Sequence, residues 1–198
     1  HTPEVLTGDV ADLAMTFILM VTRRIGESER FLREGKWLQG RMDLGTTVKG
    51  KRLGILGLGR IGKAVARRAE AFGLHIQYFD IKPMGDLTYR AYPTLIDLAK
   101  ASDILLVTCE GGEANRGLVS AEVLDALGPD GFLVNTARGP IIDEPAMVKA
   151  LKEGRIAGAG LDVFDREPIV PEELMAMENV VLTPVSYTHL TLPTILPV

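Results

Sequence analysis

The sequence has 198 residues, enough for one domain and part of a second, since a domain averages ~150 residues. Hydrophobic residues make up 46% and charged residues 24%, a composition that is typical of soluble globular proteins and excludes a disordered or fibrous chain. The net charge of −4 and the pI of about 5.5 give no basic surface, so we expect neither nucleic acid nor a membrane as a partner.

The first 50 residues show helical patterns and no strand pattern. They predict a long helix over residues 9–24, a second helix over 28–34 and a polar connection up to residue 50. The apolar run at 13–21 is shorter than the roughly 20 residues that a membrane-spanning helix needs. We expect helices that pack on a sheet domain or on a second subunit. Because the chain begins with HTPEV and no methionine, we also expect the native start to lie upstream.

From residue 51 onward, short apolar runs alternate with helical patterns. Continuously apolar runs are typical of strands that are buried on both faces of a parallel sheet. Thr94, Ser120 and Asp143 are predicted N-caps of the helices between the runs. The pattern predicts an α/β domain over residues 51–184, with a doubly wound, Rossmann-like parallel sheet. The predicted strands lie at 52–57, 75–80, 103–108, 131–136, 156–162 and 179–183.

The segment GLGRIG places Gly57, Gly59 and Gly62 in the G-x-G-x-x-G spacing between a predicted strand and a predicted helix. Such a turn lets the backbone and the helix N-terminus approach a pyrophosphate. Asp80 follows the next strand, where a carboxylate can accept hydrogen bonds from the adenosine ribose and repel a 2′-phosphate. The motif therefore predicts NAD rather than NADP as the cofactor, although Lys82 would offset part of that repulsion.

Three segments, GILGLGRIG, VNTARGPIIDE and GAGLDVFDREP, stand in an order and spacing that resembles the D-isomer-specific 2-hydroxyacid dehydrogenases, nearest to the glyoxylate/hydroxypyruvate reductase group. The resemblance covers roughly residues 2–184. It implies an NAD-binding domain here and a separate substrate domain, formed by the two chain ends in that family, that is absent from this sequence. It also implies that residues 1–50 connect the domains and contribute to a homodimer.

The resemblance implies a role for individual residues. Arg138 would bind the carboxylate of a 2-oxo acid through its planar guanidinium, and Glu167 would hold and polarise a catalytic histidine. Arg60 and Ile61 would bind the pyrophosphate through their backbone. The residues implied on the nicotinamide side are Cys109, Thr136, Ala137, Arg138 and Asp162. The segment TCEGGE, residues 108–113, departs from the family, which usually has proline and threonine there. No metal ligand set is implied.

The catalytic histidine of the resembling family would stand at position 185, where this chain has Val185. His189 comes four residues later, too far for the tight tolerance of a catalytic site. Residues 185–198 contain no Asp, Glu, Lys, Arg or Gly, and VSYTHLTLPT resembles a translated sequencing adaptor. We therefore expect residues 185–198 to be a non-native tail.

These features predict an oxidoreductase of the cytoplasm that reduces a small 2-oxo acid, similar to glyoxylate or hydroxypyruvate, with NADH. The single Cys109 fits a reducing compartment. Without the histidine, the chain is expected to bind NAD and to be inactive. One alternative is a non-catalytic, NAD-responsive interaction module like the corepressors that resemble this family. Another, a methyltransferase with a Rossmann-like core, fits Arg138 and the FDREP segment less well.

Overall fold

A parallel sheet of seven strands forms the centre of the computed structural model, which describes residues 5–81 and 88–185. Lys82 and His189 lie outside the described residues. The strand order β3-β2-β1-β4-β5-β6-β7 reverses direction between β1 and β4, which confirms the doubly wound topology. The strands are β1 (Arg52–Leu56), β2 (His75–Phe79), β3 (Arg90–Ala91), β4 (Ile104–Val107), β5 (Phe132–Asn135), β6 (Gly158–Leu161) and β7 (Val180–Leu182).

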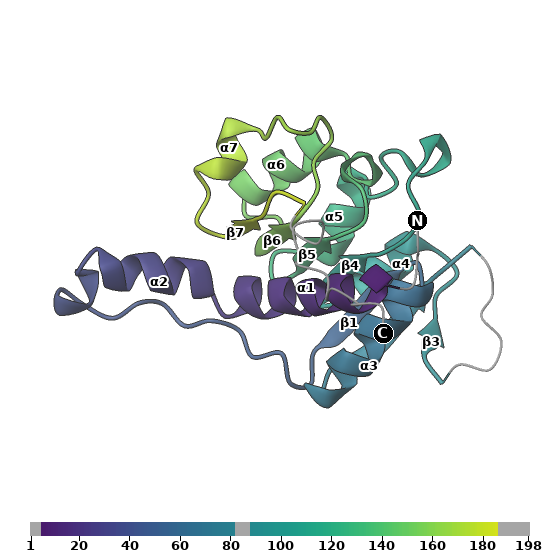
Figure 1. The fold of residues 1–198 in the computed structure, drawn as a ribbon, viewed down its shortest axis with the longest axis horizontal. Coiled ribbons are helices and arrows are strands. Elements are labelled where there is room, and N and C mark those ends of the chain that lie inside the picture. Colours follow the sequence, from purple (N-terminus) through teal and green to yellow (C-terminus); the bar gives the residue numbers. More distant parts are fainter. Residues whose placement is uncertain (1–4, 82–87, 186–198) are drawn as a thin grey trace, which may run out of the picture.

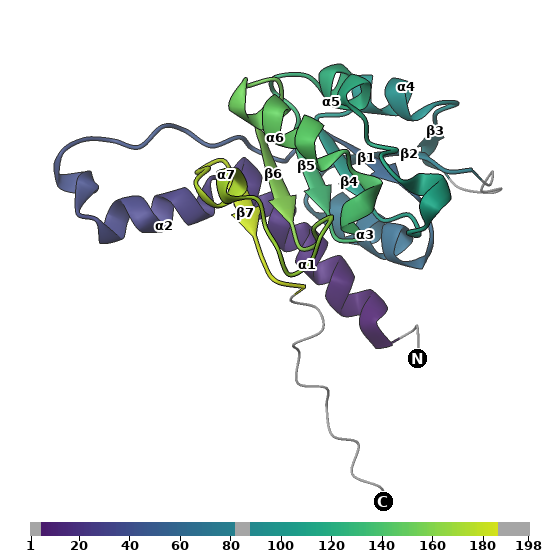
Figure 2. The same ribbon diagram turned by 90° about the horizontal axis from the view of Figure 1, so that it is seen from above.

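Helices cover both faces of the sheet, as Figure 2 shows in profile. One face carries α1 (Val5–Thr22) and α3 (Arg60–Ala71), which pack against each other. The opposite face carries α4 (Leu95–Lys100), α5 (Ala121–Leu127) and α6 (Glu144–Lys152), and the short α7 (Glu172–Met175) precedes β7. Among the described residues, no helix is both long and apolar enough to cross a membrane.

The two faces of the sheet contribute to separate hydrophobic cores. In β4, Leu105 packs into the core beneath α4, α5 and α6, whereas Leu106 packs into the core beneath α1 and α3. Both side chains are fully buried. Because successive side chains of a strand point to opposite faces, a strand covered on both sides needs an unbroken apolar run, and this is the pattern that predicted the strands.

Two of the three predicted helix caps form. The Thr94 hydroxyl accepts a hydrogen bond from the Asp97 N–H at 3.1 Å, and an Asp143 carboxylate oxygen accepts one from the Ala146 N–H at 3.1 Å. Each bond satisfies a backbone donor that the first helical turn leaves free. Ser120 occupies the N-cap position of α5, but its side chain makes no capping bond.

Residues 25–47, here termed the arm, extend away from the sheet domain (Figure 1). The arm contains α2 (Ile25–Arg33) and a 3-10 turn (Lys36–Leu38). Arg24 separates α1 from α2 because its backbone takes the left-handed conformation, with φ of 54°, and its guanidinium donates two hydrogen bonds to Glu27 at 2.6 and 2.7 Å. No residue of α2 is buried, so this helix packs only loosely against the other described residues.

Candidate functional site

The glycine-rich turn joins β1 to α3 at the point where the strand order reverses. Gly57 has a positive φ of 90°, and a Cβ there would lie 2.6 Å from the Cα of Cys109. A Cβ at Gly62 would lie 2.5 Å from the carbonyl oxygen of Gly57. Both positions therefore require glycine for the turn to pack against β4 and for α3 to start directly on the turn.

The N-terminus of α3 has no side-chain cap, because its N-cap residue is Gly59. The first N–H groups of a helix lack partners within the helix and carry partial positive charge. Arg60 and Ile61 begin this helix, which is 12 residues long, and Arg60 adds a full charge. The turn thus presents an arrangement that suits a phosphate group.

Asp80 lies next to the glycine-rich turn at the end of β2. One of its carboxylate oxygens accepts a hydrogen bond from the Leu58 N–H at 2.8 Å, which fixes the side chain beside the turn. A cavity of about 310 Å³ opens here, which we term the β2-side cavity. It is lined by Leu56, Gly57, Gly59, Phe79, Asp80, Ile81, Thr108, Cys109, Glu110, Asn115 and Leu118.

A second cavity of about 730 Å³ lies over the ends of β4 and β5, and we term it the β5-side cavity. Thr108, Cys109 and Glu110 line both cavities, so the two adjoin. They meet at the carboxyl ends of the strands, where open α/β sheets bind ligands. The β5-side lining also includes Ile61, Thr136, Ala137 and Arg138 from the sequence prediction. It further contains residues that the prediction missed, namely Leu6, Thr7, Val10, Gly111, Gly112, Glu113, Arg116, Pro140 and Ile141.

Cys109 sits between the two cavities and is partly buried. Burial raises the pKa of its thiol to about 11, and the carboxylates of Asp80 and Glu110 add to the rise. A thiol with this pKa is almost wholly protonated at neutral pH, and the protonated form is not the nucleophile. Cys109 therefore lines the site and does not act as a nucleophile there.

Arg138 follows β5 and is exposed at the β5-side cavity. Its guanidinium donates to the carbonyl oxygen of Ala137 at 2.6 Å, and no carboxylate of the described residues lies within ion-pair distance. Arg116 lines the same cavity, but it pairs with Asp165 at 3.0 Å and with Glu113 at 3.6 Å. Arg138 is thus the cavity arginine whose charge the described part of the chain leaves uncompensated.

Asn135 fixes the backbone around Arg138 and was missed from the sequence. Its side chain is fully buried at the end of β5. The amide oxygen accepts from the Ala137 N–H at 3.0 Å, and the amide nitrogen donates to the Arg138 carbonyl at 3.0 Å. A polar residue at the last position of an apolar strand was the available signal, because such a side chain has to find partners when buried.

Thr136 and Asp162 lie at the ends of the neighbouring strands β5 and β6. The Thr136 hydroxyl is buried and has no hydrogen-bond partner among the described residues. Asp162 is fully buried, accepts a hydrogen bond from the Thr183 hydroxyl, and does not line either cavity. The structure therefore brings Asp162 to the correct edge of the sheet but not to the cavity surface.

Glu167 lies outside both cavities. It is exposed, and one carboxylate oxygen accepts from the Phe164 N–H at 3.0 Å. The Val185 N–H donates a hydrogen bond to the Asp162 carbonyl oxygen at 3.0 Å. The φ of Val185 is 51°, in the left-handed region that β-branched residues rarely adopt. In the part of the chain that the structure describes, no cluster of His, Cys, Asp or Glu is arranged to hold a metal ion.

The domain is a Rossmann-type α/β domain with a ligand crevice at its topological switch point. This follows from the strand order, from the glycine-rich turn and from the Asp80 carboxylate beside that turn. The family model of the D-isomer specific 2-hydroxyacid dehydrogenase NAD-binding domain matches residues 15–186. The chain therefore belongs to this family, and the resemblance noted in the sequence is confirmed.

Known relatives agree with this assignment. The chain is 55% identical over 186 residues to glyoxylate/hydroxypyruvate reductase A of Arabidopsis thaliana and 53% identical over 184 residues to hydroxyphenylpyruvate reductase of Plectranthus scutellarioides. Each match covers 93% of this chain and 59% of the relative.

Solved structures show the same fold. The NADPH-dependent glyoxylate/hydroxypyruvate reductase of Sinorhizobium meliloti, in complex with NADP and malonate, superimposes with a TM-score of 0.90 at 46% identity. This match covers 94% of this chain and 59% of that one. The chain thus spans less than two thirds of the length of these relatives.

Proposed function

We propose that the whole protein reduces a small 2-oxo acid, such as glyoxylate or hydroxypyruvate, to the 2-hydroxy acid with NADH, and that this chain supplies the cofactor-binding domain. The uncompensated charge of Arg138 at the cavity is the observation that carries the proposal. A guanidinium that no described carboxylate neutralises is available for an external anion, and its planar fork matches a carboxylate in two parallel hydrogen bonds.

The proposed roles of the other residues follow from their places. The glycine-rich turn and the N–H groups of Arg60 and Ile61 would hold the pyrophosphate, and Asp80 the adenosine ribose. Thr136 and Ala137 would line the nicotinamide side, with Asp162 behind them. Bound NADH would supply the hydride. Arg138 would orient the substrate so that its carbonyl faces that hydride, and would polarise the carbonyl oxygen.

Reduction of a carbonyl also needs a proton for the new alkoxide, and Val185 has no proton to give. Glu167 would orient a donor, and none of the described residues places one beside it. General acid catalysis contributes on the order of 10²- to 10⁴-fold to such rates, and loss of substrate positioning costs more. We therefore propose that this chain binds NADH and does not turn over. The unfavourable backbone of Val185 supports the proposal that residues 185–198 do not belong to the domain.

Two measurements on the purified chain test the function. Titration with NADH, followed by the cofactor's fluorescence, should give saturable binding at one site per chain. Incubation of the chain with NADH and glyoxylate should leave the absorbance at the nicotinamide band unchanged over hours. Absence of binding would refute the proposed cofactor domain. Rapid oxidation of NADH that depends on glyoxylate would refute the proposal that this chain does not turn over.

For the cofactor we propose NAD over NADP, on the evidence of Asp80. The carboxylate is held beside the glycine-rich turn by the Leu58 N–H, so it cannot swing away from a ligand in the β2-side cavity without losing that bond. A fixed negative charge accepts ribose hydroxyls and opposes a 2′-phosphate. The relative from Sinorhizobium meliloti is NADPH-dependent, so the proposal of NAD for this chain rests on its own residue Asp80.

We also propose that the whole protein is a homodimer whose subunits meet at the arm. Apolar side chains of the arm are exposed, among them Trp37 at 70%, Leu38 at 95% and Leu44 at 94%. A cavity of about 630 Å³, lined by Leu44 and by residues of α1, α2 and β7, lies between the arm and the sheet. Exposed apolar side chains that gather on one segment are typical of an interface with another protein chain, and most oligomers consist of copies of one chain.

Replacing exposed apolar residues of the arm is expected to change the oligomeric state. The double replacement Trp37→Ser and Leu38→Asp is expected to convert the dimer to a monomer, because the apolar contacts are lost and a charge enters the interface. Sedimentation equilibrium of both chains measures the mass. As the matched control, Ile169→Asp changes an equally exposed apolar residue, 68% exposed, outside the arm and should leave the mass unchanged. An unaltered mass for the arm variant would contradict the proposed interface.

A further inference from the structure

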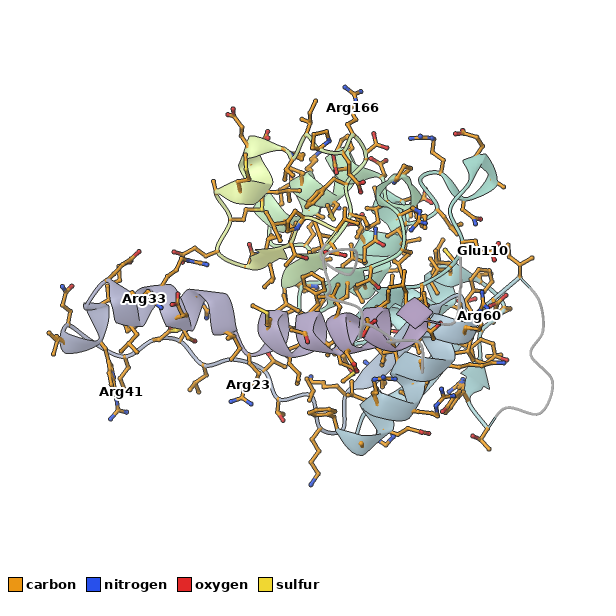
Figure 3. The ribbon with its side chains drawn as sticks, in the orientation of Figure 1. Arg23, Arg33, Arg41, Arg60, Glu110 and Arg166 are labelled. Carbon is orange, nitrogen blue, oxygen red and sulfur yellow. The ribbon has the colours of Figure 1, made fainter. Side chains whose placement is uncertain are left out.

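The segment after β4 contains an acidic side chain whose position the proposed function does not use. Glu110 is exposed and lines both the β2-side and the β5-side cavity. The Asn115 side chain donates a hydrogen bond to the backbone carbonyl oxygen of Glu110 at 2.7 Å, and this bond fixes the turn that carries Glu110. Figure 3 shows Glu110 at the same end of the molecule as Arg60, the first residue of α3.

Glu110 and Asp80 approach the β2-side cavity from opposite sides of β1. The register pairs Leu56 of β1 with Phe79 of β2 and with Val107 of β4. The residues that follow these strands, Asp80 on one side and Glu110 on the other, therefore flank the glycine-rich turn. Both residues line the β2-side cavity together with Cys109, and both carboxylates contribute to the raised pKa of the Cys109 thiol.

The β2-side cavity is acidic. Its lining contains two carboxylates and, among the described residues, no lysine or arginine. Arg60 does not line it, and Arg116 is engaged by Asp165 and Glu113. A cavity walled by negative charge admits a neutral ribose with its two hydroxyls, and it raises the free energy of a bound phosphate dianion.

We propose that Glu110 is a second specificity-determining residue, which acts with Asp80 to reject the 2′-phosphate of NADP(H). The proposal rests on the proposed function, since it assigns the β2-side cavity to the adenosine half of the cofactor. Rejection by charge is a form of specificity that acts most strongly on the ligand with the extra charge. NADH carries the pyrophosphate and NADPH carries a 2′-phosphate in addition, so the charge of Glu110 lowers the affinity for NADPH more than that for NADH.

The size of the effect on NADPH affinity depends on how exposed the Glu110 side chain is. Asp80 is half-buried and anchored, so its charge is poorly screened, whereas Glu110 is exposed to solvent and ions. Charges separated by a few ångströms in a largely aqueous medium interact weakly, and salt screens them with a length of about 8 Å at 0.15 M. We expect Glu110→Gln to tighten NADPH binding about three- to tenfold at low ionic strength and less than that at 0.5 M salt.

The test measures dissociation constants of NADH and NADPH by fluorescence titration of the full 198-residue chain. The variants are Glu110→Gln, which keeps the shape of the side chain, and Glu113→Gln as the matched control. Glu113 is an acidic neighbour that lines only the β5-side cavity. Neutralising Glu113 should leave the ratio of the two constants within twofold of the parent chain.

The outcomes separate the two proposals. A lower NADPH dissociation constant for Glu110→Gln, with a smaller change in the NADH constant and an effect that salt reduces, supports the inference. An unchanged ratio of the two constants in Glu110→Gln, or an equal change of the ratio in Glu113→Gln, overturns it while the NAD site stands. Failure of the parent chain to bind either cofactor refutes the proposed function itself, before any variant is compared.

Discussion

Replacing Gly59 with alanine is expected to weaken NADH binding on the order of 100-fold, equivalent to about 2.7 kcal/mol, and to leave folding almost unchanged. A Cβ at Gly59 would meet no atom within 4 Å, and its φ of −71° suits any residue. Contacts with the described residues therefore give no reason for glycine at this position. The reason has to come from a ligand that approaches the backbone, as a pyrophosphate does at the second glycine of this motif.

Two measurements check the Gly59→Ala variant. Fluorescence titration gives the NADH constant, and urea denaturation gives the free energy of unfolding, which should fall by less than about 1 kcal/mol, the cost of a poorer N-cap residue. Gly40→Ala serves as control, because a Cβ there also meets nothing within 4 Å and Gly40 lies in the arm. Full NADH affinity in Gly59→Ala would show that the pyrophosphate does not lie against this turn.

The opposite result is expected for Gly139→Ala, which should lower the free energy of unfolding by about 3 kcal/mol or more. A Cβ at Gly139 would overlap the carbonyl group of Phe164 and the amide of Asp165. These are backbone atoms that cannot rotate away, so the strand ends must shift, and overpacking of this kind costs about 1 to 3 kcal/mol or more. Urea denaturation of Gly139→Ala and Gly40→Ala side by side gives the difference.

A Gly139→Ala variant as stable as the parent chain would contradict the close packing of the two segments. Their contact matters for the site, because Gly139 follows Arg138 directly. The backbone of residues 138–139 is held against the segment that begins at Phe164 and carries Glu167. In a folded fraction of the variant, NADH should still bind, but more weakly, since the glycine-rich turn follows β1 whereas the residues proposed for the nicotinamide side directly precede Gly139.

The sheet was predictable because each central strand has to be apolar on both faces. All six predicted strands exist, each within two residues of the expected bounds. The strand that was missed, β3, has two residues that are both exposed, and two exposed residues carry no periodic signal. The sequence predicted the break between α1 and α2 only to within a few residues. The break depends on the left-handed backbone of Arg24, and no local sequence pattern indicates that conformation.

The candidate site was predictable where a residue follows a strand. Asp80 and Arg138 stand beside their cavities because parallel strands bring their carboxyl ends to one edge. Leu6, Thr7 and Val10 reach the β5-side cavity only because α1 crosses the sheet, and nothing within α1 itself indicates that contact. The partner of Asp162 likewise comes from a distant segment, because the hydroxyl of Thr183, the residue after β7, donates a hydrogen bond to its carboxylate.

Helix α1 connects the β5-side cavity with the arm. Its first turns line the β5-side cavity, its middle lies on β5 and β6, and its last residue leads through Arg24 into the arm. A helix of 18 residues is about 27 Å long and stiff along its axis. A ligand in contact with Leu6 or Thr7 would therefore press on the same rigid helix that leads into the arm.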